Sequence, residues 1–464
     1  MDYKEYFKGK KITQLGLGLL GRGVGDAIFI AECGADLIVT DLKTEEELKT
    51  SVEKLKSFPN VSLHLGGHNL EDFKNRDFIL KGAGVPLDSI YIEEARKNNI
   101  PIEMDSSLFF KLLPEGVITI GVTGTRGKST VTHLINNILK SAGKKTIIGG
   151  NVRDTATLPY IKDFYLGVQP LDSFVVLELD SWQLQGFGDS KISPHVAIFT
   201  AFMHDHTNYY KSTAEMPGHE RYFQDKSNIY LYQKKGDALI VGEEIASVIA
   251  GKPHGEGEIF IARKSGVPKD WNPKIIGEHN LLNISCAIEA CRALGISNED
   301  IKKGVESFEG VEGRLQFVKE VGGVKIYNDN NATTPEATIA ALAAISSKSQ
   351  VPSLNEAEKN IILICGGSDK NLELDKLIEE INKTCKFVVL LPGSGSEKFS
   401  SKLLSSQASK LIRVPNLSEA ITEAIKHANS GDIILFSPAF ASFGQFKNEY
   451  DRNDKFMEII NSIE

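Results

Sequence analysis

The segment ITIGVTGTRGKSTVTHLINNILKSAG, residues 118–143, decides the fold. It joins an apolar run, a glycine-rich turn and a stretch with apolar residues at helical spacing, which predicts a strand, a loop and a helix. Glycines at 121, 124 and 127 let backbone N–H groups face an anion, and a helix that begins near Lys128 presents its positive dipole end there. The turn therefore predicts a nucleotide phosphate site, with Lys128 as a cation and Ser129 or Thr130 as a metal-binding hydroxyl.

The turn departs from the general phosphate-loop pattern, because Val122 stands where a glycine is expected. An ordinary strand-to-helix turn is the alternative, but the coincidence of strand, Gly-Lys-Ser and helix favours ATP. The residues expected to bind ATP in this turn are Gly124, Thr125, Arg126, Gly127, Lys128, Ser129 and Thr130.

On both sides of this segment, short apolar runs alternate with helical patterns, which predicts βαβ units and parallel sheets. Such runs include FVVLELD (174–180), HVAIFTAF (195–202), ALIVG (238–242), VKIYNDN (324–330), NIILICGGSDK (360–370), KFVVLLPGSGS (386–396), LIRVPN (411–416) and DIILFSPAF (432–440). The polar run at 346–360 is expected to be a surface loop. We expect an α/β protein of three consecutive domains: Rossmann-like at 1–114, P-loop-type ATPase at 115–312 and Rossmann-like at 313–464.

Composition excludes several classes of protein. The 464 residues include 53 Lys and Arg against 61 Asp and Glu, a net charge of −8, which argues against sequence-independent nucleic-acid binding. No run approaches the ~20 apolar residues of a membrane helix, so membrane insertion is not expected. The polar start MDYKEYFKGKK does not resemble a secretory signal peptide. Five scattered cysteines without a CxxC pair favour a reducing cytoplasm over a disulfide scaffold.

Two residues after apolar strands are candidate metal ligands. Glu178 ends FVVLE, where a buried carboxylate needs a cation or a partner, and His206 follows another apolar run. Because strand ends of an α/β sheet gather at the ligand crevice, both could converge with the phosphate loop on Mg²⁺. The alternatives are a salt bridge for Glu178 and a turn cap for His206.

The N-terminal run GLGLLG (16–21) follows an apolar strand, and Asp41 comes twenty residues after Gly21. This spacing matches the dinucleotide-binding fingerprint, in which an acidic residue binds a ribose. Taken alone, the run favours NAD(P) binding or a tight strand–helix turn.

GTRGKST preceded by TG is similar to the signature of the Mur ligases and folylpolyglutamate synthases. Further landmarks in the same order extend the resemblance over nearly the whole chain: LELDSWQL (177–184), MHDHTNYY (203–210), DKSNIYLYQ (225–233), GEHNLLN (277–283), NDNNATTPEA (328–337), GGSDK (366–370) and SPAFASFGQFKNEYDRNDKF (437–456). Among Mur ligases, the chain looks most like those that add D-glutamate to UDP-N-acetylmuramoyl-L-alanine. Both compounds are then the implied substrates of an ATP-dependent, acyl-phosphate-forming enzyme.

The resemblance also implies roles for individual residues, with ATP and two Mg²⁺ ions as cofactors. It implies that the catalytic residues are Lys128, His206, Lys226 and Arg314. It also implies that the metal ligands are Ser129, Glu178, His206 and a Lys226 carbamylated by CO₂. Asn280, Asn283 and Arg314 join the ATP site, whereas Gly18, Leu19, Leu20, Asp41 and Asn151 bind the UDP-linked substrate. Thr333, Lys370, Ser442 and Phe443 bind D-glutamate. The alternatives are an ordinary structural lysine at 226 and a solvated loop lysine at 370. A monomer is expected.

Four positions depart from the family pattern. Asn331 replaces a lysine, Gly313 a histidine, Asp180 a serine and Glu449 an aromatic residue. These changes leave open a related ligase with another amino-acid acceptor, a catalytically silent nucleotide-binding scaffold and, from the N-terminal glycines, an NAD(P)-dependent enzyme.

Overall fold

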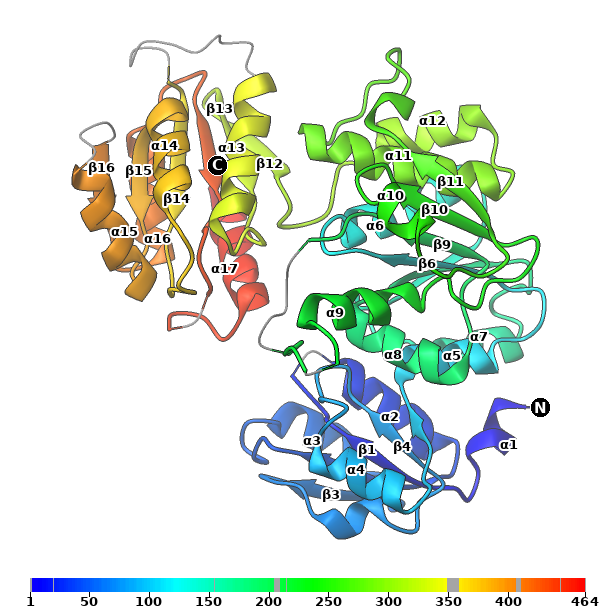
Figure 1. Ribbon diagram of the computed structural model, residues 1–464. Helices are drawn as coiled ribbons and strands as arrows, with labels where there is room; N and C mark the ends of the chain where they lie inside the picture. Colours follow the sequence, from blue (N-terminus) through cyan, green and yellow to red (C-terminus); the bar gives the residue numbers. More distant parts are fainter. Residues whose placement is uncertain are drawn as a thin grey trace. The chain divides into compact units, whose positions relative to one another are not determined.

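The computed structural model describes residues 2–19, 21–153, 155–203, 209–213, 215–348, 359–405, 410–442 and 444–463. The chain divides into two compact units. The first contains Met1–Pro268 and Leu282–Val305, and the second contains Lys269–Leu281 and Glu306–Glu464. Each described part combines helices with β-sheets (Figure 1), so the predicted α/β class is confirmed.

The first unit begins with a parallel sheet in the order β3-β2-β1-β4-β5. Its strands are β1 (Lys11–Leu15), β2 (Asp36–Asp41), β3 (Val61–Leu65), β4 (Phe78–Lys81) and β5 (Ile102–Glu103). Its helices are α1 (Tyr3–Phe7), α2 (Arg22–Glu32), α3 (Lys49–Leu55), η1 (Leu70–Phe73), α4 (Ile90–Lys97) and α5 (Asp105–Leu112). The GLGLLG turn connects β1 to α2, as predicted, and therefore lies at the carboxyl end of a central strand.

The second sheet is also parallel, in the order β11-β10-β9-β6-β8-β7. Its strands are β6 (Ile118–Thr123), β7 (Thr146–Gly150), β8 (Phe174–Glu178), β9 (Val196–Phe199), β10 (Ala238–Gly242) and β11 (Glu258–Ala262). The helices around it are α6 (Lys128–Ser141), η2 (Leu158–Tyr160), α7 (Ile161–Tyr165), α8 (Ser181–Ser190), α9 (Gly218–Ser227), α10 (Ala246–Ala250), η3 (Lys264–Gly266), α11 (Glu278–Ala293) and α12 (Asn298–Ser307). Since β6 is an interior strand, the loop that follows it is flanked by the ends of β8 and β9.

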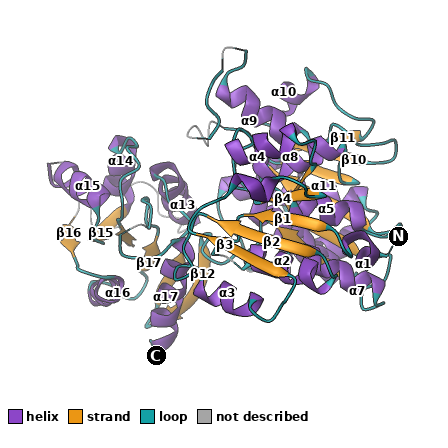
Figure 2. Cartoon of the chain, turned by 90° about the horizontal axis from the view of Figure 1, so that it is seen from below, coloured by secondary structure: helices purple, strands orange, loops and turns teal. Residues whose placement is uncertain are grey.

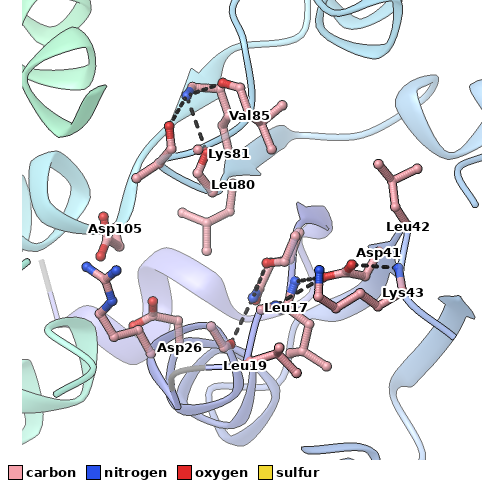
Figure 3. Close-up of a pocket in the computed structure, with 18 of the residues that line it drawn as sticks. Leu17, Leu19, Asp26, Asp41, Leu42, Lys43, Leu80, Lys81, Val85 and Asp105 are labelled. Carbon is pink, nitrogen blue, oxygen red and sulfur yellow. Dashed lines mark hydrogen bonds between the residues drawn. The ribbon is translucent and has the colours of Figure 1, made fainter. Parts of the chain in front are cut away.

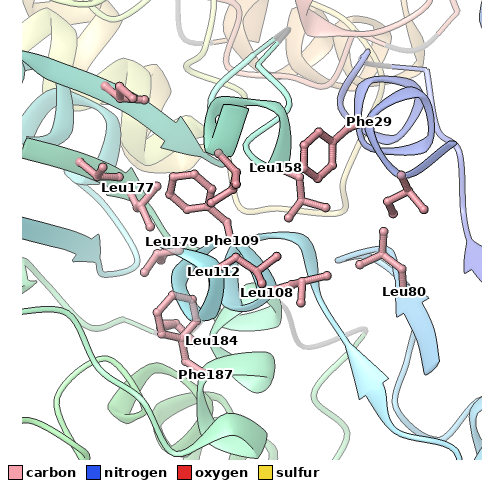
Figure 4. Close-up of a cluster of buried hydrophobic side chains, with 14 of the residues drawn as sticks. Phe29, Leu80, Leu108, Phe109, Leu112, Leu158, Leu177, Leu179, Leu184 and Phe187 are labelled. Carbon is pink, nitrogen blue, oxygen red and sulfur yellow. The ribbon is translucent and has the colours of Figure 1, made fainter. Parts of the chain in front are cut away.

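One hydrophobic core joins these two sheets. Phe29 of α2, Leu80 of β4, Leu108 and Phe109 of α5 and Leu177 of β8 belong to a single cluster of buried side chains (Figure 4). Burying such side chains contributes roughly 1.5–3 kcal/mol each. The first two sheets are therefore held together by a continuous apolar contact that α5 helps to build.

The second unit contains a mixed sheet in the order β12-β13-β17-β14-β15-β16. Its strands are β12 (Gln316–Val321), β13 (Val324–Asn328), β14 (Ile361–Cys365), β15 (Cys385–Leu390), β16 (Lys410–Arg413) and β17 (Ile433–Phe436). Only β12 runs antiparallel among the described pairs of this sheet. Gly322 and Gly323 join β12 to β13 with φ of 57° and 80°, the positive values that a two-residue hairpin turn requires.

Helices cover both faces of this third sheet (Figure 2). They are α13 (Pro335–Lys348), α14 (Asp375–Thr384), α15 (Ser394–Ser405), α16 (Leu417–Lys426) and α17 (Glu449–Ser462). The side chains of β14 alternate between the faces: Ile361 and Leu363 pack with α13, α14 and α15, whereas Ile362 and Ile364 pack with α16 and α17. A strand buried on both faces explains its uninterrupted apolar sequence. Among the described residues, no helix combines the length and the apolar character that a membrane crossing demands.

Candidate active site

A glycine-rich turn links β6 to α6 at the middle of the second sheet. Gly124 has a φ of 144°, and a Cβ atom at this position would lie 2.0 Å from Oγ1 of Thr200. Gly127 caps α6 in the left-handed conformation, with a φ of 86°. Because neither position can hold a side chain without strain, the turn keeps its backbone accessible where α6 presents its positive end. This is the geometry of a phosphate-binding loop.

Neighbouring strands fix the shape of the turn. The hydroxyl of Thr200, just after β9, donates to the carbonyl oxygens of Thr123 (3.1 Å) and Arg126 (2.5 Å). The backbone N–H of Thr125 donates to the carbonyl oxygen of Ala201 at 2.7 Å. Sequence reasoning missed Thr200, although its place at the end of the apolar run 195–202 was a usable signal.

Two lysines contact the turn. Lys128, half-buried in the first turn of α6, donates from Nζ to the carbonyl oxygens of Gly124 (2.9 Å) and Thr125 (3.3 Å). Lys226 of α9 donates to the same Gly124 oxygen (3.0 Å) and approaches Oγ1 of Thr123 (3.3 Å). Lys226 is 1% exposed, so it is not the surface cation that its polar surroundings in the sequence suggest.

Glu178 ends β8 beside the turn, as predicted. In the sheet it pairs with Val122 of β6 on one side and Gly150 of β7 on the other. Its side chain is 5% exposed, and Nδ2 of Asn151 lies 3.4 Å from its Oε1. A buried carboxylate needs a donor or a cation, so its position suits a metal ligand.

The remaining proposed metal ligands are only partly described. Ser129 is half-buried in the first turn of α6, whereas His206 lies outside the described residues. The described residues contain no group of three or more His, Cys, Asp or Glu side chains that could hold a metal ion. Glu178 and Ser129 nevertheless offer the carboxylate and hydroxyl oxygens that Mg²⁺ prefers, alongside ATP phosphates and water.

The predicted adenine residues lie in α11. A Cβ atom on Gly127 would come within 2.3 Å of Oδ1 of Asn283, so Asn283 contacts the phosphate turn closely. Asn280 belongs to the second unit, where its Nδ2 donates to the carbonyl oxygen of Ile276 at 2.7 Å. Arg314 also belongs to the second unit.

A cavity of about 360 Å³ lies at the carboxyl end of the first sheet (Figure 3). Its lining includes Gly18, Leu19, Asp41, Lys43 and Lys81. Leu19 is exposed, as a ligand contact requires, whereas Leu20 lies outside the described residues. The sequence analysis did not single out Lys43, which lies two residues after β2, or Lys81, which ends β4.

Asp41 closes the glycine-rich turn of the first sheet. Its carboxylate accepts hydrogen bonds from the backbone N–H groups of Leu17 (2.8 Å), Gly18 (3.0 Å) and Lys43 (2.9 Å). Burial acts to raise its pKa, but these three hydrogen bonds and the charge of Lys43 outweigh burial, so the pKa of Asp41 lies below its ordinary value. Oδ2 accepts from the glycine-rich turn and Oδ1 from the backbone N–H of Lys43, which weakens the case for a ribose-binding acid.

Lys81 is a buried cation in the same cavity. Its Nζ donates to the carbonyl oxygens of Val85 (2.8 Å), Gly82 (3.3 Å) and Ala83 (3.4 Å). Burial lowers the pKa of Lys81 to about 8. Lys81 thus organises the loop after β4, which forms one wall of the cavity.

In the second unit, two of the predicted amino-acid ligands meet. Nζ of Lys370 donates to Oγ1 of Thr333 at 3.1 Å, although 37 positions separate them in the sequence. Ser442 is buried, and it follows Ala441, which pairs with Ser368 in an isolated bridge near Lys370. Phe443 lies outside the described residues.

The four departures from the family pattern have structural partners. Asn331 donates from its backbone to the carbonyl oxygen of Gly313 (2.9 Å), and a Cβ atom on Gly313 would lie 3.1 Å from Nδ2 of Asn331. Asp180 caps α8 in a reciprocal arrangement with Gln183. Glu449 begins α17, and its carbonyl oxygen accepts from Nδ2 of Asn330 at 2.8 Å.

Comparison with protein families assigns most of the central and C-terminal chain. Residues 122–254 match the Mur ligase middle domain, and residues 313–440 match the Mur ligase glutamate ligase domain. Together with the sheets and the phosphate turn, these matches define an α/β protein with a P-loop-type nucleotide-binding domain. The chain belongs to the Mur ligase family.

Curated relatives are similar over the full length. A UDP-N-acetylmuramoylalanine–D-glutamate ligase of Roseiflexus sp. is 33% identical, over 98% of this chain and 99% of its own length. The ligase of the same name from Clostridium acetobutylicum is 33% identical, over 100% and 98%. The one from Borreliella burgdorferi is 32% identical, over 97% of each chain.

Solved structures share the fold at lower identity. UDP-N-acetylmuramate-alanine ligase of Thermotoga maritima aligns over 98% of this chain and 99% of its own, with a TM-score of 0.60 and 19% identity. E. coli FolC in complex with ADP aligns over 77% and 92%, with a TM-score of 0.54 and 16% identity. These likenesses agree with the predicted three-domain α/β architecture.

Proposed function

We propose that the protein is an ATP-dependent amide ligase that adds D-glutamate to UDP-N-acetylmuramoyl-L-alanine in peptidoglycan precursor synthesis. Full-length similarity to ligases of that name supports this activity. The observation that carries the chemistry is the phosphate turn, where Lys128 and Lys226 both contact the Gly124 carbonyl and Glu178 ends the adjacent strand.

The carboxylate of a peptide end is a poor electrophile. In the proposed reaction it attacks the γ-phosphate of ATP, which yields an acyl phosphate and ADP. The amine of D-glutamate then attacks the acyl carbon and loses a proton, and the tetrahedral intermediate expels inorganic phosphate. Attack of one anion on another needs nearby positive charge, which Lys128 and the N-terminus of α6 would provide. From the family resemblance, we propose the same role for Arg314.

Two Mg²⁺ ions are proposed to share the site. Ser129, Glu178, His206 and a carbamylated Lys226 would hold them, and bound Mg²⁺ would neutralise charge on the phosphates. The burial of Glu178 and the nearness of Lys226 to the phosphate turn support this assignment.

The adenine end of ATP is proposed to contact Asn280 and Asn283. The closeness of Asn283 to Gly127 supports this placement. The turn residues Gly124 to Thr130, Arg126 included, would surround the phosphates.

The cavity of the first sheet is proposed to bind the UDP part of the substrate. Gly18, Leu19 and Leu20 would face the diphosphate at the N-terminus of α2, while Asp41 would hold the turn in shape. Asn151 would contact the substrate from the central domain. We assign residues 1–114 to this UDP-substrate-binding domain, 115–312 to the ATP-binding domain and 313–464 to the amino-acid-binding domain.

D-glutamate is proposed to bind in the third domain, at Thr333, Lys370, Ser442 and Phe443. The Lys370–Thr333 hydrogen bond supports a shared binding surface, and a lysine facing a carboxylate makes a strong charge-assisted pair. Asn331 stands where the family pattern has a lysine, so the choice of acceptor amino acid is the most specific part of this proposal. We further propose that the protein acts as a monomer in the cytoplasm.

Phosphate release tests the proposal. Purified protein is supplied with ATP, Mg²⁺, UDP-N-acetylmuramoyl-L-alanine and a panel of D- and L-amino acids. Release that depends on both the muramoyl nucleotide and D-glutamate is expected. Phosphate release with another amino acid would identify that amino acid as the acceptor. If ATP is not consumed with any amino acid of the panel, the ligase function is contradicted.

A further inference from the structure

Arg22 connects the cavity of the first sheet to the second sheet. It is the first residue of α2 and lines the cavity. Its Nη1 donates to Oδ1 of Asn151 at 2.9 Å and lies 3.5 Å from the carbonyl oxygen of Gly150. Gly150 ends β7 and Asn151 follows it, so one guanidinium group bridges two sheets of the first unit.

This hydrogen bond fixes the orientation of the side-chain amide of Asn151. Because Oδ1 accepts from Arg22, Nδ2 must point the other way, where it lies 3.4 Å from Oε1 of Glu178. The backbone N–H of Asn151 also donates to the carbonyl oxygen of Glu178 at 2.7 Å. Arg22, Asn151 and Glu178 thus form a chain from the nucleotide cavity to the edge of the phosphate turn.

The position of Arg22 is itself constrained. Helix α2 approaches the central domain so closely that a Cβ atom on Gly25 would lie 2.4 Å from Cβ of Ala156. Asp26 is buried on the same helix and accepts a hydrogen bond from the backbone N–H of Leu158. These contacts leave α2 little freedom to rotate, which keeps the Arg22 side chain directed at Asn151.

Two acidic side chains, Asp26 and Asp105, interact electrostatically with Arg22 on the cavity side. Burial raises the pKa of Asp26, and the nearby carboxylate of Asp105 raises it further, while the positive charge of Arg22 offsets part of this effect. Burial likewise raises the pKa of Asp105, and Arg22 is the largest influence that lowers it. Figure 3 shows Asp26 and Asp105 on the same side of the cavity.

We propose that Arg22 is a positioning residue: it sets the orientation of the Asn151 amide, so that the amide N–H group faces Glu178 and the muramoyl end of the substrate. The assignment rests on the proposed function, because Asn151 matters only if the UDP-linked substrate binds there. Without the Arg22 donor, the long 3.4 Å contact with Oε1 of Glu178 would have to orient the amide of Asn151, so the amide would lose its shorter hydrogen bond and much of its constraint.

Steady-state kinetics of Arg22→Met test this role. Methionine keeps much of the apolar stem but removes every donor. The KM for UDP-N-acetylmuramoyl-L-alanine is expected to rise roughly tenfold, the usual scale for one hydrogen bond from a charged group. The KM for D-glutamate should change less than about twofold, because a single local contact is lost. Arg22→Lys should recover part of the loss, since lysine keeps the charge without the planar fork.

Lys162→Met is the matched control. Lys162 pairs with Glu32 at the other end of α2, across the same contact between the two sheets, but it does not line the cavity. It should leave the KM for the muramoyl nucleotide unchanged. If it raises that KM as much as Arg22→Met does, the effect reflects a loosened contact and the positioning role is wrong.

A double variant separates action through Asn151 from independent binding. Arg22→Met combined with Asn151→Ala should have the same KM as Asn151→Ala alone, because the first change has nothing left to misplace. If the two substitutions multiply each other's effects on the KM in the double variant, or if Arg22→Met has a normal KM, the proposal is wrong. Both results assume that the wild-type protein is an active ligase. An inactive wild-type enzyme would instead contradict the proposed function itself.

Discussion

Lys128 and Lys226 donate to one and the same carbonyl oxygen, that of Gly124, at 2.9 and 3.0 Å. They reach it from different helices, α6 and α9. Two cations that converge on a single neutral acceptor repel each other, most strongly where burial limits solvent screening. The pair brings two positive side chains to the phosphate turn, which supports the proposed ATP site.

The first prediction concerns the modification. Lys226→Ala should lose activity, and short-chain carboxylic acids should restore part of it by supplying the missing carboxylate. The same acids should not restore Lys128→Ala, whose role requires a cation. ADP formation measures both variants. Full activity of Lys226→Ala without additives would mean that Lys226 is a structural residue.

The second prediction concerns the phosphate turn. Lys128→Ala should lower ADP formation by roughly 100-fold or more, because it removes charge stabilisation at the transferring phosphate. Lys140→Ala is the matched control, since Lys140 lies in the last turn of the same helix and is exposed. Near-normal turnover of Lys128→Ala would remove the phosphate-loop assignment.

The third prediction uses two glycines with positive φ. Gly124→Ala places Cβ 2.0 Å from Oγ1 of Thr200, whereas Gly143→Ala, with a φ of 71°, meets no atom within 4 Å. Gly143→Ala should cost only the roughly 1–2 kcal/mol of a left-handed alanine. Gly124→Ala should be less stable than Gly143→Ala in thermal unfolding and should bind ATP weakly. Equal stability and ATP affinity of the two variants would contradict the close packing of the turn.

The fourth prediction concerns Asp329 in the second unit. Burial raises its pKa from 3.8 to about 7, although Ser437, Leu315 and Arg314 act to lower it. The folded protein therefore holds a proton that the unfolded chain has released, and this contribution to stability is lost as the pH rises from about 4 to about 7.

Chemical denaturation of Asp329→Asn across this range tests the assignment. The variant cannot ionise, so it should gain stability relative to wild type as the pH rises, by on the order of a few kcal/mol at most. The pH-dependent part of the difference in unfolding free energy between Asp329→Asn and wild type should be smallest near pH 4, where Asp329 is protonated in the folded protein. A difference that does not depend on pH would show that Asp329 titrates normally.

The fifth prediction concerns the amino-acid site. Lys370→Met should raise the KM for D-glutamate by roughly 10- to 100-fold, the scale of a lost charge-assisted hydrogen bond. Lys398→Met is the control, because Lys398 pairs with the neighbouring Asp369 and is not a proposed ligand. The KM for ATP should stay unchanged in both. Equal effects of the two substitutions on D-glutamate would argue against the site.

Local sequence patterns predicted the strands that are buried along almost their whole length. The strands β6, β8 and β14 are short and mostly apolar, and the helix after the phosphate turn begins at Lys128 as expected. β3 and β12 were missed because their side chains are only partly buried, so their sequences alternate or mix polar residues. β12 runs antiparallel because the hairpin at Gly322–Gly323 reverses the chain, and this turn was not recognised from the sequence.

The sequence predicted the positions of those candidate site residues that are placed by the strand directly before them. Glu178 and Gly124 are fixed by the strands that precede them, so their positions follow from the sequence. Lys226 required tertiary contacts, because only the packing of α9 buries its polar sequence against the turn. Arg22 was missed for the same reason: its partner Asn151 lies 129 positions away.

The most direct measurement of the central claim follows oxygen atoms through one turnover. UDP-N-acetylmuramoyl-L-alanine carrying heavy oxygen in its alanine carboxylate is converted with ATP and D-glutamate, and the released phosphate is analysed by mass spectrometry. If the carboxylate is activated as an acyl phosphate, one heavy oxygen appears in each phosphate released. Amide product accompanied by unlabelled phosphate would contradict the account.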